Sequence, residues 1–478
     1  MFIKIAYKSI LFSIFTIKLK ILLMKKILFS LALISITGLA QAQTPTWVTK
    51  TTGAPALHFA TNVKAVDANT IWFSDTASSS ATDTGRYIGL STDGGNTWTN
   101  KLVTGPVAAA TIGDMHPISA TTAWIVSSGS GSQNGIWKST NAGTSWTKQT
   151  TASFNTGVSF ANVVHFWDEN VGFAAGDPFQ SGANQRFEMY TTTNGGTTWT
   201  NIPAGTAPAP LNGAEFGYTN KITVQGNNIW LGTDLGRVLY SPNRGASWQA
   251  FQTPAVDFGG VTVSGFTADV AFRDSTNGLL ASDEDGVSLL YSTTDSGANW
   301  TPITPNGPFY ANNIVYVPGT ANTYVSSGYD LGSSYSTDGG LNWTEIGNDP
   351  TYEKYFGSLS FISPTVGFTG GVSQAQSTAT GLPFPSFSVL SGDLTLAVSD
   401  VNVNKTKLTA FPNPAVDVVN LKSSKDIKEI AIIDLSGKVV KREKSNGQVN
   451  VSNLAKGTYV AQAIYTDGSV ENTKVIKK

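Results

Sequence analysis

Short apolar runs separated by polar turns recur from about residue 47 to residue 390. Each repeat opens with a run that ends in a polar turn, such as Val63–Asp67, and a second short run follows, such as Ile71–Phe73. A third run, such as Arg86–Leu90, comes before a Gly-rich turn. Apolar runs of this length bounded by Gly, Asn and Asp are typical of β-strands. The pattern predicts an all-β chain with four strands in each repeat.

The Gly-rich turn is the most regular feature of the repeats. It reads STDGGNTW, STNAGTSW, TTNGGTTW, SPNRGASW, TTDSGANW and STDGGLNW, and its tryptophans lie 43 to 53 residues apart. A repeat of this length in a chain rich in strands predicts a β-propeller with one four-stranded sheet per repeat. The turn residues are Asp93 and Trp98, Asn141 and Trp146, Asn194 and Trp199, Asn243 and Trp248, Asp295 and Trp300, and Asp338 and Trp343.

These turns are interpreted as structural elements. The Asp or Asn oxygen is expected to accept hydrogen bonds from backbone N–H groups two residues on, and the glycine supplies a positive φ. Three of the six copies carry Asn in place of Asp, which removes the charge that metal binding or acid chemistry would need. A turn requires only an acceptor oxygen, so both residues serve it.

A seventh sheet is predicted without a turn of this kind. Residues 357–372 repeat the first two strands, and Ser386–Leu390 supplies a third. The segment Thr46–Lys50 resembles the strand that follows each turn. We therefore expect this N-terminal strand to pair with the C-terminal strands and close a seven-bladed ring, which would remove two open sheet edges.

The phrase S-x-D-x-G-x-x-W resembles the Asp-box, or BNR repeat, of sialidases, sortilin-type receptors and xyloglucanase-type hydrolases. The complete repeat is most similar to the seven-bladed propellers of photosystem II assembly factors and their bacterial relatives, above all at FWDENVGFAAGDP in residues 166–178. The resemblance covers about residues 45–392 and implies the fold more than any one function.

The C-terminal segment has a different pattern. Short alternating strands with Gly turns follow LTAFPNPAVDVVNL, and they predict a small Ig-like β-sandwich over residues 405–478. The Phe-Pro-Asn-Pro opening, the Gly-x-Tyr strand and the basic end resemble the type A sorting domain of the type IX secretion system. This resemblance implies contact with the secretion machinery, passage through the periplasm, and a secreted or cell-surface location. An ordinary Ig-like adhesion module is the alternative.

The N-terminal residues 24–42 have the features of a signal peptide. Met24-Lys25-Lys26 is positive, residues 27–40 are apolar, and Ala40-Gln41-Ala42 fits a cleavage site before Gln43. Residues 1–23 are interpreted as an upstream extension, or alternatively as part of a long signal or membrane anchor. The predicted organisation is residues 1–42 as extension and signal, 43–392 as propeller, 393–404 as linker and 405–478 as sorting domain.

Charge and cysteine content exclude several classes of function. Residues 43–404 hold 12 Lys and Arg against 25 Asp and Glu, whereas residues 405–478 hold 13 against 7. An acidic body repels phosphates and argues against nucleic-acid binding. The chain has no cysteine, so it has neither disulfides nor Cys-ligated zinc. No cofactor or metal site is predicted, and we expect a monomeric propeller.

Two sets of candidate binding residues emerge. Aligning the first strands of the repeats places Lys64, His116 and His165 at one equivalent position beside the central channel. There they would form a pocket for an anion or a metal. The alternative is that the histidines are packed and hydrogen-bonded without a ligand. Aromatic residues on longer loops suit contact with a glycan or a protein, although they could equally cover blade edges. These are Phe216, Tyr218, Tyr352 and Tyr355.

The residues required for catalysis are weakly represented. A sialidase needs an arginine triad, and the body has too few well-placed arginines. A glycosidase needs two carboxylates about 5–10 Å apart, for which Asp177, Glu215 and Asp257 are loop candidates. The sequence therefore predicts an exported propeller that binds a protein or polysaccharide without catalysis, with a secreted glycoside hydrolase as the alternative.

Overall fold

The structure is a computed structural model. It describes residues 44–54, 58–77, 85–105, 110–129, 134–154, 158–328, 332–347, 356–376, 383–395, 408–423, 425–434, 438–444, 447–466 and 470–478. These residues form two compact units that divide at Ser399. The predicted signal peptide and most of the predicted linker lie outside the described residues.

The first unit is built from four-stranded antiparallel sheets, seven in the described part of the chain. The first two sheets comprise β2 (His58–Ala65), β3 (Ile71–Ala77), β4 (Tyr87–Ser91) and β5 (Thr99–Leu102), then β6 (Thr111–Pro117), β7 (Ala123–Ser128), β8 (Gly135–Ser139) and β9 (Thr147–Lys148). The next two comprise β10 (Ala161–Phe166), β11 (Gly172–Phe179), β12 (Arg186–Thr192) and β13 (Thr200–Asn201), then β14 (Gly217–Gln225), β15 (Asn228–Thr233), β16 (Arg237–Ser241) and β17 (Gln249–Gln252). The fifth and sixth comprise β18 (Phe266–Phe272), β19 (Gly278–Glu284), β20 (Val287–Thr293) and β21 (Thr301–Ile303), then β22 (Asn313–Tyr316), β23 (Tyr324–Gly328), β24 (Gly332–Ser336) and β25 (Thr344–Glu345). A single turn of 3-10 helix, Gly182–Asn184, precedes β12.

The remaining sheet joins both ends of the unit. It consists of β26 (Phe356–Ser363), β27 (Val366–Gln376), β28 (Pro383–Ser391) and β1 (Thr46–Thr51), in the order β1-β28-β27-β26. β1 pairs antiparallel with β28, with Thr46 opposite Ser391 and Thr51 opposite Ser386. The expected pairing of the N-terminal strand with the C-terminal strands is therefore confirmed.

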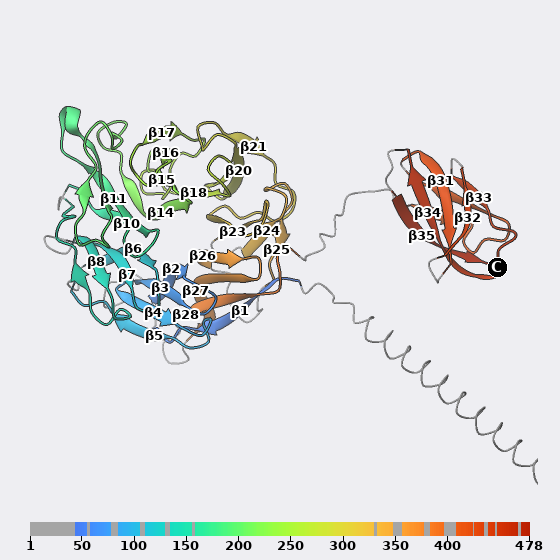
Figure 1. Cartoon of the computed structure of the whole chain (residues 1–478), viewed down its shortest axis with the longest axis horizontal. Coiled ribbons are helices and arrows are strands. Elements are labelled where there is room, and N and C mark those ends of the chain that lie inside the picture. The colour runs from blue at the N-terminus through green and yellow to red at the C-terminus, as the bar shows by residue number, and fades with distance from the viewer. Residues whose placement is uncertain are drawn as a thin grey trace, which may run out of the picture. The chain divides into compact units, whose positions relative to one another are not determined.

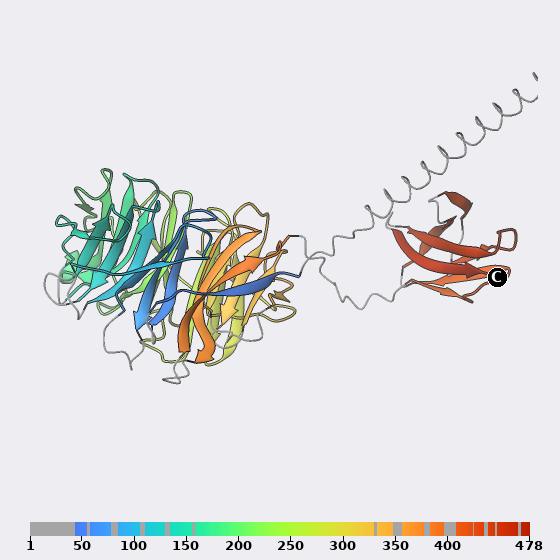
Figure 2. The same cartoon turned by 90° about the horizontal axis from the view of Figure 1, so that it is seen from below.

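The sheets are arranged around a common centre in a propeller-like ring. The first strand of each sheet contacts the first strand of the next, and β26 contacts β2, so the series returns to its start. Figure 1 shows the colour running around the ring until the orange strands lie beside the blue ones, and Figure 2 shows the sheets standing side by side. Apolar clusters fill the spaces between neighbouring sheets, as where Trp124 of β7 stacks on Phe166 of β10 at 3.5 Å between ring centroids.

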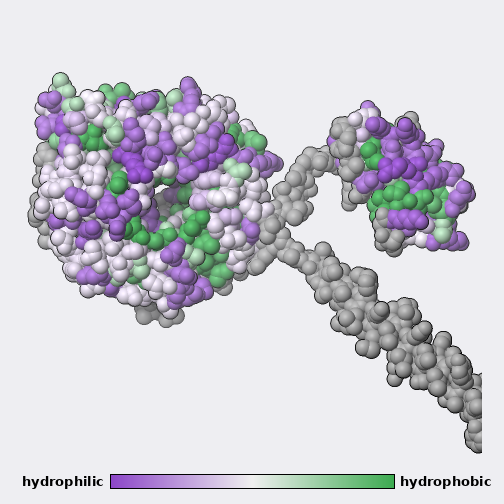
Figure 3. Space-filling model, in the orientation of Figure 1, coloured by the Kyte–Doolittle hydropathy of each residue, from purple (hydrophilic) through white to green (hydrophobic). Residues whose placement is uncertain are grey.

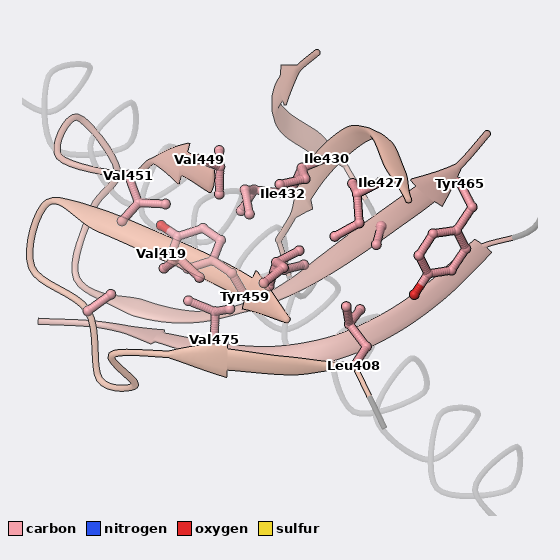
Figure 4. Close-up of a cluster of buried hydrophobic side chains, with 14 residues drawn as sticks. Leu408, Val419, Ile427, Ile430, Ile432, Val449, Val451, Tyr459, Tyr465 and Val475 are labelled. Atoms are coloured by element: carbon pink, nitrogen blue, oxygen red, sulfur yellow. The ribbon is translucent and has the colours of Figure 1, made fainter. Parts of the chain in front are cut away.

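The second unit contains two small sheets. One has the order β29-β30-β33 and the other β32-β31-β34-β35. Their strands are β29 (Thr409–Phe411), β30 (Val418–Lys422), β31 (Ile427–Ile433), β32 (Val439–Glu443), β33 (Gln448–Asn450), β34 (Gly457–Tyr465) and β35 (Val470–Lys477). Alternate residues of both sheets, including Val419, Ile430 and Ala461, form one buried core (Figure 4). This alternation is the period of two that the sequence shows in β34.

Candidate functional site

The six Gly-rich turns have one hydrogen-bond pattern. In the first, the Ser91 hydroxyl donates to Asp93 Oδ1 at 2.8 Å and accepts the N–H of Gly95 at 2.9 Å. Asp93 Oδ1 also accepts the N–H of Thr97 at 2.8 Å. The acceptor therefore serves the N–H four residues on, so the expected spacing of two residues was wrong. A hydroxyl-bearing residue two positions earlier bridges the turn and makes the wider loop possible.

The copies with asparagine use the same acceptor. Asn141 Oδ1 accepts the N–H of Ser145 at 3.0 Å, and Asn194 Oδ1 accepts that of Thr198 at 2.9 Å. All six glycines at the turn have a positive φ, between 75° and 95°. Because a neutral oxygen replaces a charged one without any change in the hydrogen-bond pattern, the geometry supports a structural role for these turns.

The structure brings Lys64, His116 and His165 together at the inner strands. The imidazole rings of His116 and His165 lie 4.3 Å apart between centroids, in an edge-to-face arrangement. Lys64 Nζ lies 3.9 Å from Asp114 Oδ1 and donates to Asn220 Oδ1 at 3.1 Å. Asp114 and Asn220 complete this cluster, although the sequence alignment of the strands did not single them out for it.

Burial and the neighbouring cation keep both histidines neutral. Desolvation and the charge of Lys64 lower the pKa of His116 to about 3. Desolvation, His116 and Lys64 also lower the pKa of His165 well below its usual range. Trp167 covers His165 at 4.8 Å between centroids. In the described part of the chain no three His, Asp or Glu side chains are placed to hold a metal ion. The histidine pair is therefore a packed pair of neutral rings beside the channel.

The channel contains a polar cavity of about 430 Å³. Its walls come from the inner strands and include Lys64, Lys221, Asn62 and Asn220, but not the two histidines. Figure 3 shows the opening of the channel at the centre of the ring, with hydrophilic and hydrophobic residues around its rim. The cavity therefore lies next to the histidine pair and shares Lys64 with it.

Two of the three candidate catalytic carboxylates are buried and fully hydrogen-bonded. Asp257 is 0% exposed and accepts the N–H groups of Gly259, Thr262 and Val263 as well as the Tyr218 hydroxyl at 2.6 Å. Its carboxylate therefore shapes the loop that follows it.

Glu215 is 1% exposed and forms a two-point ion pair with Arg237. It also accepts the N–H of Leu211 at 2.7 Å. Arg237 is the first residue of β16, and no sequence motif connects it with Glu215.

Asp177 is the third carboxylate, and it is partly exposed at the end of β11. It accepts the side-chain amide of Asn162 at 2.6 Å and the N–H of Gly217 at 3.2 Å. Burial raises its pKa to about 6 despite these hydrogen bonds, and the charge of Asp234 adds to the increase. Asp234, which the sequence did not suggest, is buried and accepts the N–H of Phe216 at 2.8 Å.

The aromatic loop residues lie close to these carboxylates. Phe216 and Tyr218 are half-buried and pack edge-to-face at 5.4 Å between centroids. The Tyr218 ring also packs so closely on Gly259 that a Cβ there would lie 2.4 Å from it. Tyr352 and Tyr355 lie outside the described residues.

Comparison with known proteins identifies the C-terminal unit. Residues 409–478 match the family model of the secretion system C-terminal sorting domain. The chain therefore carries a type IX sorting domain, which directs export to the cell surface or the extracellular space and contacts the secretion machinery. No helix among the described residues has the length and apolar character needed to cross a bilayer.

Several solved structures resemble the chain at low sequence identity. YCF48 bound to a D1 peptide is 13% identical with a TM-score of 0.49, covering 73% of this chain and 97% of that one. YCF48 from Cyanidioschyzon merolae is 14% identical with a TM-score of 0.49, covering 71% of this chain and 98% of that one. A GH74 enzyme from Niastella koreensis is 15% identical with a TM-score of 0.42, covering 87% of this chain and 65% of that one. No curated protein matches the sequence. Similarities at this level do not transfer an activity.

Proposed function

We propose that this protein is an exported seven-bladed propeller, residues 43–392, which binds a partner at the cell surface without catalysing a reaction. A signal peptide at residues 24–42 starts its export. The linker at residues 393–404 then leads to an Ig-like sorting domain at residues 405–478. The seven four-stranded sheets and the pairing of β1 with β28 support the blade count.

A surface formed by the loops that lead into the third, fourth and fifth sheets carries the proposal. The exposed side chains Phe160, Leu211 and Val261 have exposed fractions of 39%, 60% and 70%. We call these three residues, with Phe216 and Tyr218, the loop face. Exposed apolar residues gathered on the loops of a rigid scaffold are typical of binding surfaces.

Hydrogen bonds connect the segments of the loop face. The backbone N–H of Asp177 donates to the Phe160 carbonyl at 3.1 Å. The Asp177 carboxylate accepts the N–H of Gly217, the residue between Phe216 and Tyr218. The Tyr218 hydroxyl then accepts the N–H of Val261 at 3.2 Å. Loops from separate sheets are thus held against one another, which limits the entropy that they would lose on binding.

The chemistry of the loop face favours a protein over a polysaccharide. Stacking on a sugar needs an open aromatic face, whereas Phe216 and Tyr218 cover each other and Tyr218 packs on Gly259. The most exposed residues are the aliphatic Leu211 and Val261. Exposed aliphatic side chains resemble the apolar centre of a protein interface, which a polar rim surrounds.

The buried carboxylates support a role without catalysis. Glu215 and Asp257 are enclosed and hydrogen-bonded to Arg237 and to backbone N–H groups. A glycosidase needs two carboxyl groups that both reach the substrate. Of the three candidates, only Asp177 is partly exposed.

The binding proposal is tested with the full mature chain on cell-surface extracts. Cross-linking should capture a defined protein with the parent chain, and the double variant Leu211→Ser/Val261→Ser should lose it. The matched control is Leu341→Ser, which changes an exposed leucine (55%) in the last Gly-rich turn. Equal capture by the parent chain and the double variant would contradict the proposal. Capture of a polysaccharide in place of a protein would contradict the choice of partner.

The absence of catalysis is tested separately. The mature chain is incubated with soluble polysaccharides, and new reducing ends are measured for the parent and for Asp177→Asn. We expect no release above a heat-denatured control. Release by the parent that disappears in Asp177→Asn would show that the protein is a hydrolase.

A further inference from the structure

The inner strand of the fourth sheet is interrupted by a bulge. In β14, Gly217 pairs with Thr233, and the next pair is Ile222 with Leu231. Residues 218–221 thus stand opposite the single residue Gly232. Within the bulge, Asn220 has a φ of 58°, in the left-handed region that few residues other than glycine adopt. Bulges and left-handed residues of this kind concentrate at functional sites, where they redirect side chains.

The bulge extends across the channel to sheets that are not its neighbours. Asn220 accepts a hydrogen bond from Lys64, which belongs to the first sheet. Thr219 lies against Gly113 of the second sheet, so closely that a Cβ at Gly113 would be 2.8 Å from Thr219 Cγ2. The bulge therefore brings polar side chains of the fourth sheet to those of the first and second sheets, at the wall of the cavity of about 430 Å³.

Two ammonium groups, Lys64 and Lys221, line this cavity together with the carboxyl group of Asp269, and Asp114 lies 3.9 Å from Lys64. Asp114 accepts the N–H groups of Met115 and Val164, at 2.8 and 3.1 Å. Asp269 accepts those of Val270 and Ile314, at 3.0 and 3.2 Å. The hydrogen bonds to Val164 and Ile314 connect neighbouring sheets, and burial raises the pKa of both carboxyl groups.

The ammonium groups keep donors for a further acceptor. An ammonium group has three donors. Lys64 and Lys221 each make one hydrogen bond in the described part of the chain, to Asn220 Oδ1 and to the Ala268 carbonyl.

An unsatisfied acceptor lies in the same wall. Asn62 is 4% exposed, and its side-chain amide donates to Asp114 at 3.0 Å. Its Oδ1 atom has no hydrogen-bond partner among the described residues. A buried carbonyl oxygen without a donor costs about 1–3 kcal/mol, and this atom is enclosed within the wall. The side-chain nitrogen of Asn220 likewise donates to no group in the described part of the chain.

We propose that the channel cavity binds a small hydroxylated carboxylate. The ligand carboxylate accepts from Lys64 and Lys221, and a ligand hydroxyl accepts from the side-chain nitrogen of Asn220. At roughly 30 Å³ per water molecule, the cavity of about 430 Å³ has room for a molecule of the size of a single sugar acid. The net negative charge of residues 43–404, which hold 25 Asp and Glu against 12 Lys and Arg, disfavours a polyanion. This site and the loop face share the bulged strand β14, but they use different side chains.

The test uses isothermal calorimetry on the full mature chain with sodium glucuronate as the probe. Glucose, which has the same ring without the carboxylate, is the matched control, and inorganic phosphate tests for a general anion site. Glucuronate should bind at least about tenfold more tightly than either, because a hydrogen bond to a charged group contributes about 1.5–3 kcal/mol.

Three variants connect binding to the named residues. Lys64→Gln should weaken glucuronate binding at least about tenfold, whereas Lys101→Gln on the outer strand β5 should leave it unchanged. Asn220→Gly removes the side-chain amide and relieves the left-handed backbone, so it should weaken binding while the melting temperature stays equal or rises. This combination separates a binding role from a folding role.

Three results would overturn the proposal. They are no heat of binding with glucuronate at millimolar concentration, glucose or phosphate binding as tightly as glucuronate, and unchanged glucuronate affinity in Lys64→Gln. None of them bears on capture of a protein by the loop face, which the Leu211→Ser/Val261→Ser variant tests separately.

Discussion

Truncating Trp47 should weaken the whole ring, because this residue anchors the strand that closes it. Trp47 lies on β1 and is 2% exposed. Its indole N–H donates to the Ser333 hydroxyl of the neighbouring sheet at 2.6 Å, and its backbone N–H donates to the Gly347 carbonyl at 2.7 Å. Its ring packs edge-to-face on Phe361 at 6.0 Å between centroids. Trp47 therefore joins the closing sheet to the preceding one.

The expected cost combines two contributions. Replacing a buried tryptophan with alanine costs about 3–5 kcal/mol through lost packing, and the lost indole hydrogen bond adds about 1 kcal/mol. We therefore expect Trp47→Ala to lower the free energy of unfolding by about 4–6 kcal/mol. With a urea m-value near 2–3 kcal/mol per M, the midpoint would fall by about 2 M.

The assay is urea unfolding followed by far-ultraviolet circular dichroism, which does not depend on the deleted fluorophore. Val48→Ala is the matched control, because Val48 lies on the same strand but is 41% exposed. It should change the free energy of unfolding by less than about 0.5 kcal/mol. If Trp47→Ala and Val48→Ala unfold at the same midpoint, β1 does not stabilise the ring and the closure argument is wrong.

Three further predictions follow from individual contacts. Asn141→Asp keeps the acceptor oxygen of its turn and should leave the melting temperature nearly unchanged. Asn141→Leu removes this acceptor and should lower the free energy of unfolding by about 1–2 kcal/mol. A melting temperature of Asn141→Leu equal to that of the parent would contradict the turn mechanism. Because burial raises the Asp177 pKa from 3.8 to about 6, the native state binds this proton more tightly than the unfolded chain. As the pH rises from about 4 to about 6, the free energy of unfolding of the parent should therefore fall by up to about 2–3 kcal/mol. Asp177→Asn should lack this fall in urea titrations across the same pH range. Arg237→Leu leaves the Glu215 carboxylate buried without its cation and should lower the free energy of unfolding by about 3–5 kcal/mol at pH 7. The double variant Arg237→Leu/Glu215→Leu should recover much of this lost stability in thermal melts.

The sequence by itself was enough to predict the strands, the repeating turns and the pairing of the first strand with the last sheet. These features depend on residues close together in the chain: a hydroxyl, an Asx oxygen, a glycine and a tryptophan recur within eight positions, and each short apolar run follows at a regular distance. The alignment of equivalent positions also brought His116 next to His165, because like strands of neighbouring sheets occupy like positions around a ring.

Only the tertiary structure decided what the candidate residues can do. The sequence showed Glu215 and Asp257 as loop carboxylates, but their burial depends on Arg237, on Tyr218 and on backbone N–H groups that the fold brings to them. The bulge in β14 breaks the repeat pattern, so no alignment of strands could place Asn220 against Lys64. Local turn chemistry is encoded by neighbours within eight positions of the chain. The burial of Glu215 and Asp257 instead depends on partners 22 and 39 positions away, and the contact between Lys64 and Asn220 joins residues 156 positions apart.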